Sequence, residues 1–488
     1  MNETEFLIIG GGPTGIGAAL RLEEHGREWH LLEAEGRFGG LASSWVDDAG
    51  FTWDMGGHVQ FSHYERFDRH MDLALGADGW LHHERESWVW IRNRFVPYPF
   101  QNNLHRLDPD ERWACIEGLL DARQREEERE REALARRDGH PGPAAAAGQL
   151  LAAGPANFAE WMEATFGPGI TNVFMRPYNT KVWAYAPSRL DFAWIGERVA
   201  VPDLRKVLKS LCTGEDQVSW GPNALFRFPL RGGTGAVWAS LGRRLPPRRV
   251  TLGARVTRID AQRRTAICED GRSWKYRVLI NSMPLDALIR VAEGVVRPEA
   301  ADALLFSSTH IVGVGVEGPT PEHLRTKCWM YFPERNSPYY RVTVFSNYSF
   351  NNVARPREQW SLMSETSESP DKPVDQRTVV ADTLRALRED QLLPAGCELV
   401  TTVHRRIPQG YPTPFLGRDR VVGPTLRAFE DAGIFSRGRF GAWMYEVSNQ
   451  DHSFAQGYEC VDRQLQGGGP ELEPTLHAPN LVNSRRNP

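Results

Sequence analysis

Apolar and polar positions near the N-terminus predict alternating strands and helices. Residues 6–9 form an apolar run typical of a buried strand, a glycine-rich turn follows, and residues 13–20 have the composition of a helix. A second apolar run at residues 29–32 predicts another strand. A strand, a tight turn and a helix in this order predict a parallel α/β sheet with helices packed on it.

The turn between the first strand and the helix contains Gly10-x-Gly12-x-x-Gly15. Gly10 permits the tight turn, Gly12 lets the backbone approach phosphates, and Gly15 lets the helix pack on the strand, so that the helix N-terminus faces an anion. Glu33 ends the second strand near the spacing of an acid that binds a ribose hydroxyl, which disfavours NADP. The pattern predicts a dinucleotide site; the alternative is an ordinary glycine turn that caps a structural strand.

Two further glycine pairs favour a flavin over a nicotinamide. Gly39, Gly40 and Leu41 follow Arg37, where FAD proteins bring a second loop against the cofactor. Gly57, the second glycine of the other pair, leads directly into His58. We expect this loop to return to the isoalloxazine ring and to place His58 near its reactive edge; the alternative is a structural histidine.

An aromatic segment follows a predicted strand at residues 88–95. Two prolines fix an extended path after that strand and hold Tyr98 and Phe100 rigidly. Gln101 offers an amide donor and acceptor, as recognition of a planar base requires. The alternative is a proline-rich crossover with core aromatics.

The middle of the chain predicts helices. One begins at Asp108, and residues 123–154 are first almost wholly charged and then rich in Ala, Pro and Gly, which predicts a solvated helical extension and a loop without chemistry. A second helix group opens at Asn157 as a cap, with Trp161 in its first turns. Arg176 precedes a helix-breaking proline, so we expect it at an element end, with a surface ion pair as its default role.

Strand patterns return in the second half of the chain. Short strands fill residues 250–280 around a hairpin turn at residues 270–271, and the apolar run at 277–281 predicts a return to the parallel sheet. Residues 311–316, 328–332 and 339–345 predict a second, antiparallel sheet. We therefore predict an α/β fold with a discontinuous Rossmann-like FAD-binding domain (1–88, 215–300 and 420–488), a helical insertion domain (104–214) and an antiparallel β-sheet substrate domain (89–103 and 301–419).

Residues suited to a diphosphate recur in this second sheet and after it. Arginine forks onto two phosphate oxygens, and a tyrosine hydroxyl donates without adding charge. The candidates are Tyr331, Arg341, Tyr411, Arg439 and Tyr445. Each residue type is also common in half-buried sheets, so composition leaves a structural role open for any one of them. Near the end, Asn449, Gln450 and Asp451 are candidates for binding a ribityl chain.

Composition and charge narrow the classes of function. The chain has 488 residues, long enough for two or three domains, and a net charge of -4 without an unmixed basic block, which argues against nucleic acid or an anionic membrane as partner. The six cysteines include no CxxC pair, and no apolar run approaches the roughly 18 residues of a membrane span. We expect a cytoplasmic protein without a signal peptide, membrane insertion or metal site; the sequence indicates no oligomeric state.

Long, uncommon blocks spread over nearly the whole chain give a strong resemblance. In these blocks the chain resembles UDP-galactopyranose mutases, particularly of the eukaryotic type: GGHVQFSHY, VPYPFQNN, FMRPYNTKVW, WIGERVA, FRFPLRGGTG, CWMYFPE, YYRVTVFSNYS, HRRIPQGYPTP and GRFGAWMYEVSNQDHS. The resemblance is far more specific than the first glycine motif alone.

The resemblance implies a role for each matching position. FAD is implied along Gly10, Gly12, Gly15, Glu33, Gly39, Gly40, Leu41, Gly57, Arg439, Asn449, Gln450, Asp451 and Ser453, with His58 against the isoalloxazine. Uridine is implied at Tyr98, Phe100, Gln101, Asn157 and Trp161. Arg176 and Arg341 match the two arginines that hold the diphosphate and sugar. Trp329, Tyr331, Tyr411 and Tyr445 match the surrounding contacts.

The implied reaction is a ring contraction without net redox change, in which N5 of reduced FAD attacks the anomeric carbon of UDP-galactose and UDP leaves. The resemblance also implies that loops around Arg176 and near Pro202 move over the substrate. Asp203 stands where the family places an asparagine beside the sugar, and a carboxylate cannot donate, so a related nucleotide sugar stays open. NADPH or another donor is open as the flavin reductant. The rival interpretations are an FAD-dependent oxidoreductase of the amine-oxidase or desaturase type and a non-catalytic nucleotide-sugar binder.

Overall fold

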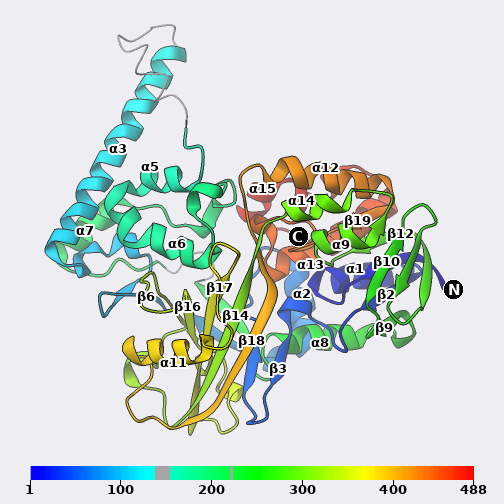
Figure 1. Cartoon of the computed structure of the whole chain (residues 1–488), viewed down its shortest axis with the longest axis horizontal. Coiled ribbons are helices and arrows are strands. Elements are labelled where there is room, and N and C mark those ends of the chain that lie inside the picture. The colour runs from blue at the N-terminus through cyan, green and yellow to red at the C-terminus, as the bar shows by residue number, and fades with distance from the viewer. Residues whose placement is uncertain (1, 138–153, 220–223) are drawn as a thin grey trace.

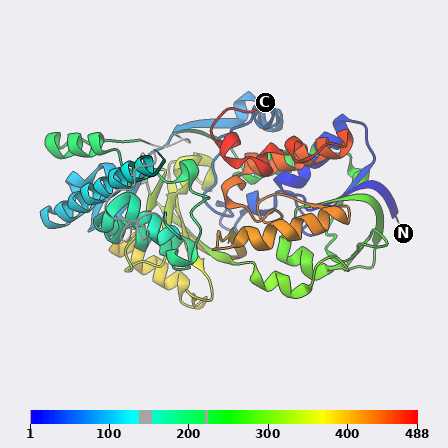
Figure 2. The ribbon, with the colours of Figure 1, turned by 90° about the horizontal axis from the view of Figure 1, so that it is seen from above.

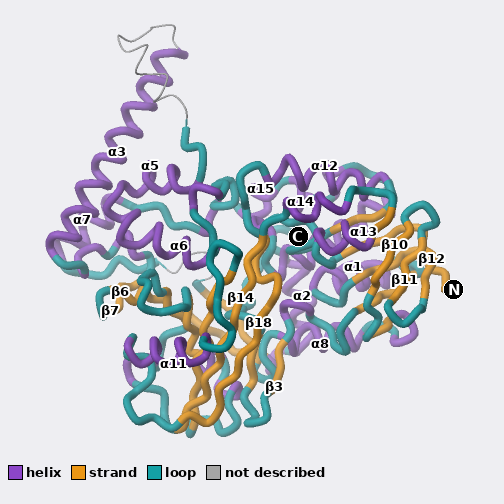
Figure 3. The backbone as a smooth tube through the Cα atoms, viewed as in Figure 1, coloured by secondary structure: helices purple, strands orange, loops and turns teal. Residues whose placement is uncertain are grey.

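Two large β-sheets and a group of helices make up the protein in the computed structural model, which describes residues 2–137, 154–219 and 224–488 (Figure 1). The helical group around α3 lies at the opposite end of the molecule from the N-terminus. Figure 2, which views the molecule from above, shows the same separation. Figure 3 shows strands β14 and β18 of the second sheet between that helical group and the helices that surround the first sheet.

The first sheet contains eight strands among the described residues, in the order β13-β10-β11-β12-β1-β2-β9 with β19 also paired to β12. Their bounds are β1 Asn2–Ile9, β2 Trp29–Glu33, β9 Val250–Leu252, β10 Val256–Asp260, β11 Thr265–Cys268, β12 Ser273–Asn281, β13 Ala292–Glu293 and β19 Ile434–Ser436. Strand β1 runs parallel to β2 and β12, and β12 runs parallel to β19. The predicted return of residues 277–281 to the parallel sheet is therefore confirmed, because these residues lie within β12. The β11–β12 hairpin also has its predicted turn at Gly271, with φ +84°.

The following helices lie around this sheet (Figure 1). They are α1 Pro13–Glu24, α2 Glu65–Leu75, α8 Gly235–Arg244, α9 Leu285–Val291, α12 Arg418–Asp431, α13 Gln450–Gln466, α14 Pro474–His477 and α15 Pro479–Asn483. Helices α1 and α13 cross closely, since a Cβ at Gly457 would lie 2.0 Å from the carbonyl oxygen of Thr14. This contact joins the first turn of α1 to the middle of α13.

The second sheet has the strand order β18-β14-β17-β16-β15-β6-β7. Its strands are β6 Ser87–Ile91, β7 Arg94–Pro97, β14 Phe306–Glu317, β15 Trp329–Tyr331, β16 Arg341–Val344, β17 Gln359–Glu368 and β18 Leu399–Pro412. Every pair is antiparallel except β15 with β6, which are parallel. Outside the two large sheets, β3 Ser44–Val46 pairs with β4 Thr52–Asp54, and β5 Trp80–Glu84 pairs with β8 Leu225–Pro229. Helices α10 Phe345–Tyr348 and α11 Val379–Glu389 follow β16 and β17 along the chain.

The single strand predicted over residues 88–95 is wrong. The segment is a hairpin, with β6 and β7 joined by Arg92 and Asn93, whose φ angles are +52° and +53°. Two left-handed residues form the tight turn that matches the twist of paired strands. Asn93 was the local signal for it, because asparagine tolerates this conformation.

The helical group consists of α3 Pro109–Arg137, α5 Phe158–Ile170, a π turn Thr171–Met175, α6 Arg176–Trp183 and α7 Leu204–Thr213. Arg176 was expected at the end of an element, and it is the first residue of α6, directly after the π turn. Pro177 lies in the first turn of α6, where a missing backbone N–H is tolerated, so the helix continues past it. The loop predicted up to residue 154 lies almost wholly outside the described residues.

The described helices include none that combines the length and the apolar character needed to cross a membrane. The predicted domain boundaries stay predictions.

Candidate active site

In the loop after β1, the backbone is tightly packed at Gly10 and Gly15 and borders open space at Gly12. Gly10 has a φ of +102°, and a Cβ at Gly15 would lie only 1.8 Å from the carbonyl oxygen of Gly10. A Cβ at Gly12, in contrast, would meet no atom nearer than 3.8 Å, and its neighbours there are Gly39 and Gly40. The backbone of Gly12 therefore borders open space at the N-terminus of α1, where an anion is favoured.

The three segments predicted to bind FAD meet at this loop. Glu33 accepts hydrogen bonds from the backbone N–H of Gly11 at 2.5 Å and of Glu35 at 2.7 Å. The N–H of Gly39 donates to the carbonyl of Gly11 at 2.9 Å. Burial raises the pKa of the Glu33 carboxyl.

The start of α13 borders a cavity of about 370 Å³. Asn449, the residue before the helix, makes no side-chain cap bond, and Gln450 accepts from the indole N–H of Trp238 at 2.6 Å. A helix N-terminus stabilises negative charge on a group close to its first turn. Ser453 lies buried one turn later and does not belong to the cavity lining.

The cavity gathers most of the sequence-predicted site residues, from strands of the second sheet, from loops and short turns, and from the start of α13. Those in its lining are Leu41, Gly57, His58, Tyr98, Gln101, Trp329, Tyr331, Arg341, Tyr411, Arg439, Tyr445, Asn449, Gln450 and Asp451. Its size falls in the range of small-molecule sites, roughly 300–1,000 Å³. Burial raises the pKa of Tyr98 and of Tyr445, so both phenols stay protonated and can donate to an oxyanion.

Three buried nitrogens of residues that line the cavity lack partners among the described residues: Nδ1 of His58, Nε of Arg439 and Nη1 of Arg198. Burial lowers the pKa of His58 to about 4, and the charges of Arg439 and Arg341 act in the same direction, so the ring is neutral at neutral pH. Buried polar atoms normally have partners. These orphaned atoms, the opening at Gly12 and the N-terminus of α13 together fit a flavin dinucleotide.

Sequence reasoning missed two arginines of the cavity. The guanidinium of Arg85 lies 4.8 Å from the ring of Tyr98 and 4.7 Å from that of Trp329. Arg198 donates from Nη2 to the carbonyl of Glu446 at 2.6 Å, lies over the ring of Tyr445 and has a buried Nη1 without a partner among the described residues. Arg198 belongs to one of the blocks that carry the resemblance, but no local pattern distinguished it from a surface arginine.

Other predicted residues lie outside the cavity lining. Phe100 is fully buried and packs against Phe174 with ring centroids 4.7 Å apart. Arg176 forms an ion pair with Glu163. Trp161 stacks on the ring of Phe158.

Asn157 and Asp203 act as helix caps. Asn157 caps α5 by accepting from the N–H of Glu160 at 3.0 Å, and Asp203 caps α7 by accepting from the N–H of Arg205 at 3.0 Å. Asparagine caps a helix as well as aspartate does, so the cap does not explain the departure at Asp203. Substrate contacts of Phe100, Trp161, Arg176 and these two caps stay predictions.

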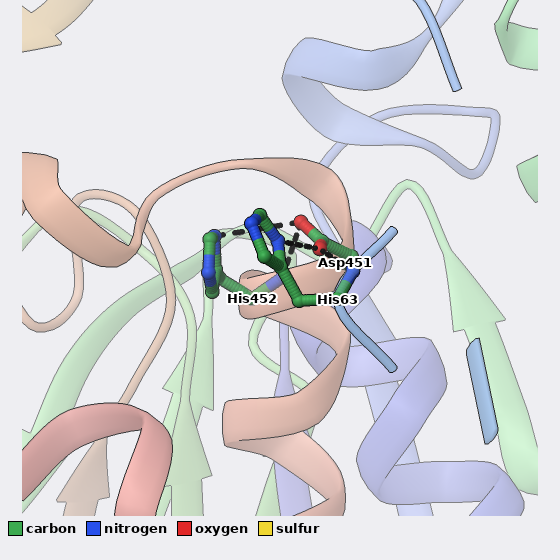
Figure 4. A group of neighbouring side chains, drawn as sticks. All are labelled: His63, Asp451 and His452. Carbon is green, nitrogen blue, oxygen red and sulfur yellow. Dashed lines mark hydrogen bonds and ion pairs between the residues drawn. The ribbon is translucent and has the colours of Figure 1, made fainter. Parts of the chain in front are cut away.

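A buried cluster of His63, Asp451 and His452 lies at the start of α13 (Figure 4). One ligand atom from each lies within 4.8 Å of the others, a spacing that merits comparison with a metal site, although the sequence predicted none. However, Nδ1 of His63 bonds Asp451 at 2.8 Å, and the two imidazole rings stack with centroids 4.9 Å apart. Nδ1 of His63 is therefore already engaged by the carboxylate of Asp451 rather than available to an ion.

Comparison with known proteins agrees with this site. The family model of flavin containing amine oxidoreductases matches residues 13–412. A crystal structure of reduced UDP-galactopyranose mutase matches with a TM-score of 0.90 and 43% identity, over 99% of this chain and 98% of that one. The chain belongs to the UDP-galactopyranose mutase family. The family resemblance expected from the sequence is thereby confirmed, and with it the assignment of this chain as an FAD-dependent isomerase.

More distant structures share the fold alone. Putrescine oxidase bound to putrescine matches with a TM-score of 0.59 and 15% identity, over 95% of this chain and 99% of that one. A CLA-producing fatty acid isomerase from P. acnes matches with a TM-score of 0.59 and 15% identity, over 94% and 98%. The UDP-galactopyranose mutase family thus uses a scaffold that also carries amine oxidation, and only the site distinguishes the chemistry.

Proposed function

We propose that this protein interconverts the pyranose and furanose forms of a UDP-hexose, with UDP-galactose as its substrate. The observation that carries the proposal is the cavity itself. Arg341 and Arg439 line it together with the hydroxyls of Tyr411 and Tyr445, beside loops that fit a flavin dinucleotide. An amine or an apolar substrate has no use for this set of donors, whereas a diphosphate does.

In this proposal the cofactor end is held by the first sheet. The Gly10–Gly15 loop and the N-terminus of α1 hold the pyrophosphate, and Glu33 holds a ribose. The neutral ring of His58 and the N-terminus of α13 flank the flavin. When bound and reduced, FAD supplies the nucleophilic nitrogen for the anomeric carbon.

The nucleotide end is held by the second sheet and the helical group. Tyr98 and Gln101 lie at the cavity wall and are placed to receive the uracil. Cleavage of the glycosidic bond leaves negative charge on the diphosphate, and guanidinium groups preorganised around it stabilise that charge more in the transition state than in the ground state. Arg341 and Arg439 provide this stabilisation, and Arg198 adds a third guanidinium to the lining of the cavity.

Aromatic side chains exclude water from the reacting centre. Tyr178 of α6 packs edge-on against Tyr331, and Trp183 packs against Tyr445, with centroids 5.3 and 4.8 Å apart. Closed walls of this kind protect a reactive sugar from hydrolysis.

The experiment is an assay of the FAD-loaded protein, reduced with dithionite, with UDP-galactofuranose and product separation by chromatography. We expect UDP-galactopyranose from the reduced protein and none from the oxidised protein. The Arg341→Ala variant should keep its flavin and lose turnover by about 100-fold or more, as expected when a charge that stabilises the transition state is removed. If the protein converts another UDP-hexose but not the galactose form, that sugar is the substrate in place of UDP-galactose. Reduction of the flavin by an amine would indicate an oxidase instead.

A further inference from the structure

We propose that Glu365 is a positioning residue for this reaction. Its carboxylate holds the guanidinium of Arg341 and the loop that carries His58 in one fixed arrangement. The inference rests on the proposed function, because that function makes Arg341 the residue that meets the diphosphate.

The sheet sets the first half of this arrangement. Arg341 on β16 and Glu365 on β17 are direct partners in the antiparallel register, so their side chains leave the same face. Nε of Arg341 donates to Oε1 of Glu365 at 2.8 Å, and Nη2 donates to Oε2 at 2.8 Å. This two-pronged pairing fixes the plane of the guanidinium and leaves Nη1 without a protein partner among the described residues.

The loop before His58 and the hydroxyl of Tyr340 supply the remaining hydrogen bonds to the carboxylate of Glu365. The N–H of Gly57 donates to Oε1 at 3.0 Å, and the hydroxyl of Tyr340 donates to Oε2 at 2.8 Å, so each oxygen accepts two hydrogen bonds. A Cβ at Gly57 would lie 3.2 Å from Oε1 and 3.6 Å from the central guanidinium carbon of Arg341. The backbone next to His58 is therefore packed directly on the ion pair.

The negative charge of Glu365 indicates that this residue positions other groups rather than strengthening substrate binding. Its side chain is only 2% exposed, and Arg341 together with the hydrogen bonds lowers its pKa although burial alone would raise it. An anion this close to a diphosphate site opposes binding of the diphosphate. A residue that served affinity alone would not be acidic here, so its contribution is the geometry that it imposes on Arg341 and on the His58 loop.

The test compares Glu365→Gln with the wild type as full-length, FAD-loaded protein. An amide cannot accept from all four donors, so Arg341 and Gly57 lose their common anchor. We expect kcat to fall by about 10- to 100-fold, the effect of a small misplacement of reacting groups. Flavin content should stay unchanged, and the Kd for UDP should change by less than about 3-fold or tighten because a negative charge is removed. The conservative variant Glu365→Asp keeps the charge but shortens the reach, so its kcat should fall as well; full activity of that variant would overturn the inference.

Glu368→Gln is the matched control, since Glu368 lies on the same strand, pairs with Arg406 and is outside the cavity lining. It should leave kcat within about 2-fold, because its bonds to Arg406 and His310 hold no group of the cavity lining in place. The decisive measurement is a double-mutant cycle: Glu365→Gln should cost less in the Arg341→Ala background than in the wild type, because the part of its effect that acts through Arg341 is then already lost. Wild-type kcat in Glu365→Gln, or losses that multiply in the cycle, would overturn the inference. An inactive wild type would instead refute the proposed function.

Discussion

Arg176 is bound to Glu163 by an ion pair, outside the cavity that contains Arg341. The two side chains are 38% and 54% exposed. An ion pair this accessible contributes only about 0–1 kcal/mol. A bound diphosphate can therefore compete for Arg176 at small cost, which reconciles its position with the role that the family resemblance implies.

This relationship gives the first prediction. Glu163→Gln removes the competing carboxylate, so the Kd for UDP should fall by about 2- to 5-fold, corresponding to loss of a weak ion pair. Arg176→Ala should raise that Kd. Both are measured by calorimetry on the FAD-loaded protein. If neither change alters UDP binding, Arg176 does not reach the ligand.

Arg198 should contribute to nucleotide affinity. Arg198 lines the cavity and its buried Nη1 has no partner among the described residues, and Arg198→Met removes that donor while keeping an apolar side chain over Tyr445. We expect the Kd for UDP to rise about 10-fold, the effect of losing one charge-assisted hydrogen bond. The control is Arg205→Met, which removes an equal charge from an exposed position on α7. If both variants raise the Kd for UDP equally, Arg198 acts only through the net charge of the protein and not through a hydrogen bond to the nucleotide.

Substitutions at Gly12 and Gly15, in and next to the loop after β1, should affect different properties of the protein. Gly12 borders open space, so Gly12→Val should fold with nearly wild-type thermal stability and bind little FAD. Gly15→Ala places a methyl group 1.8 Å from the carbonyl of Gly10, so it should destabilise the fold itself, by about 1–3 kcal/mol. Flavin absorbance and thermal unfolding distinguish the two. A yellow Gly12→Val protein would contradict the placement of the pyrophosphate.

His452 should make stability depend on pH. Burial lowers its pKa from 6.5 to about 4, so the folded state binds its proton less readily than the unfolded state does. The stabilisation is complete above pH 6.5 and is lost as pH falls toward 4. His452→Phe keeps a ring against His63 without a titrating nitrogen.

Over that interval the wild type should lose up to about 3 kcal/mol of unfolding free energy relative to the variant. Denaturant titrations at several pH values measure the difference. Asp54 and Glu459, whose pKa values burial raises to about 7, titrate in the opposite sense, but they are present in both proteins and cancel. Parallel curves for the two proteins would show that His452 titrates normally.

Local chemistry of the chain determined the elements and the cofactor class. The glycines at positions 10 and 15 lie where backbone sterics admit almost nothing else, and alternating apolar residues specify buried strands in either sheet. The same local rules missed the hairpin at residues 92–93, because its turn depends on two residues in an uncommon conformation.

The tertiary structure alone decided which polar side chains meet. Glu365 and Arg198 come from segments far apart in the chain, and both reach one cavity, whereas Phe100 turns into the core. Pattern and propensity describe neighbours along the chain. Whether a guanidinium faces a ligand or a carboxylate depends on the packing of distant segments, which sets the distances and the desolvation that act on every charge.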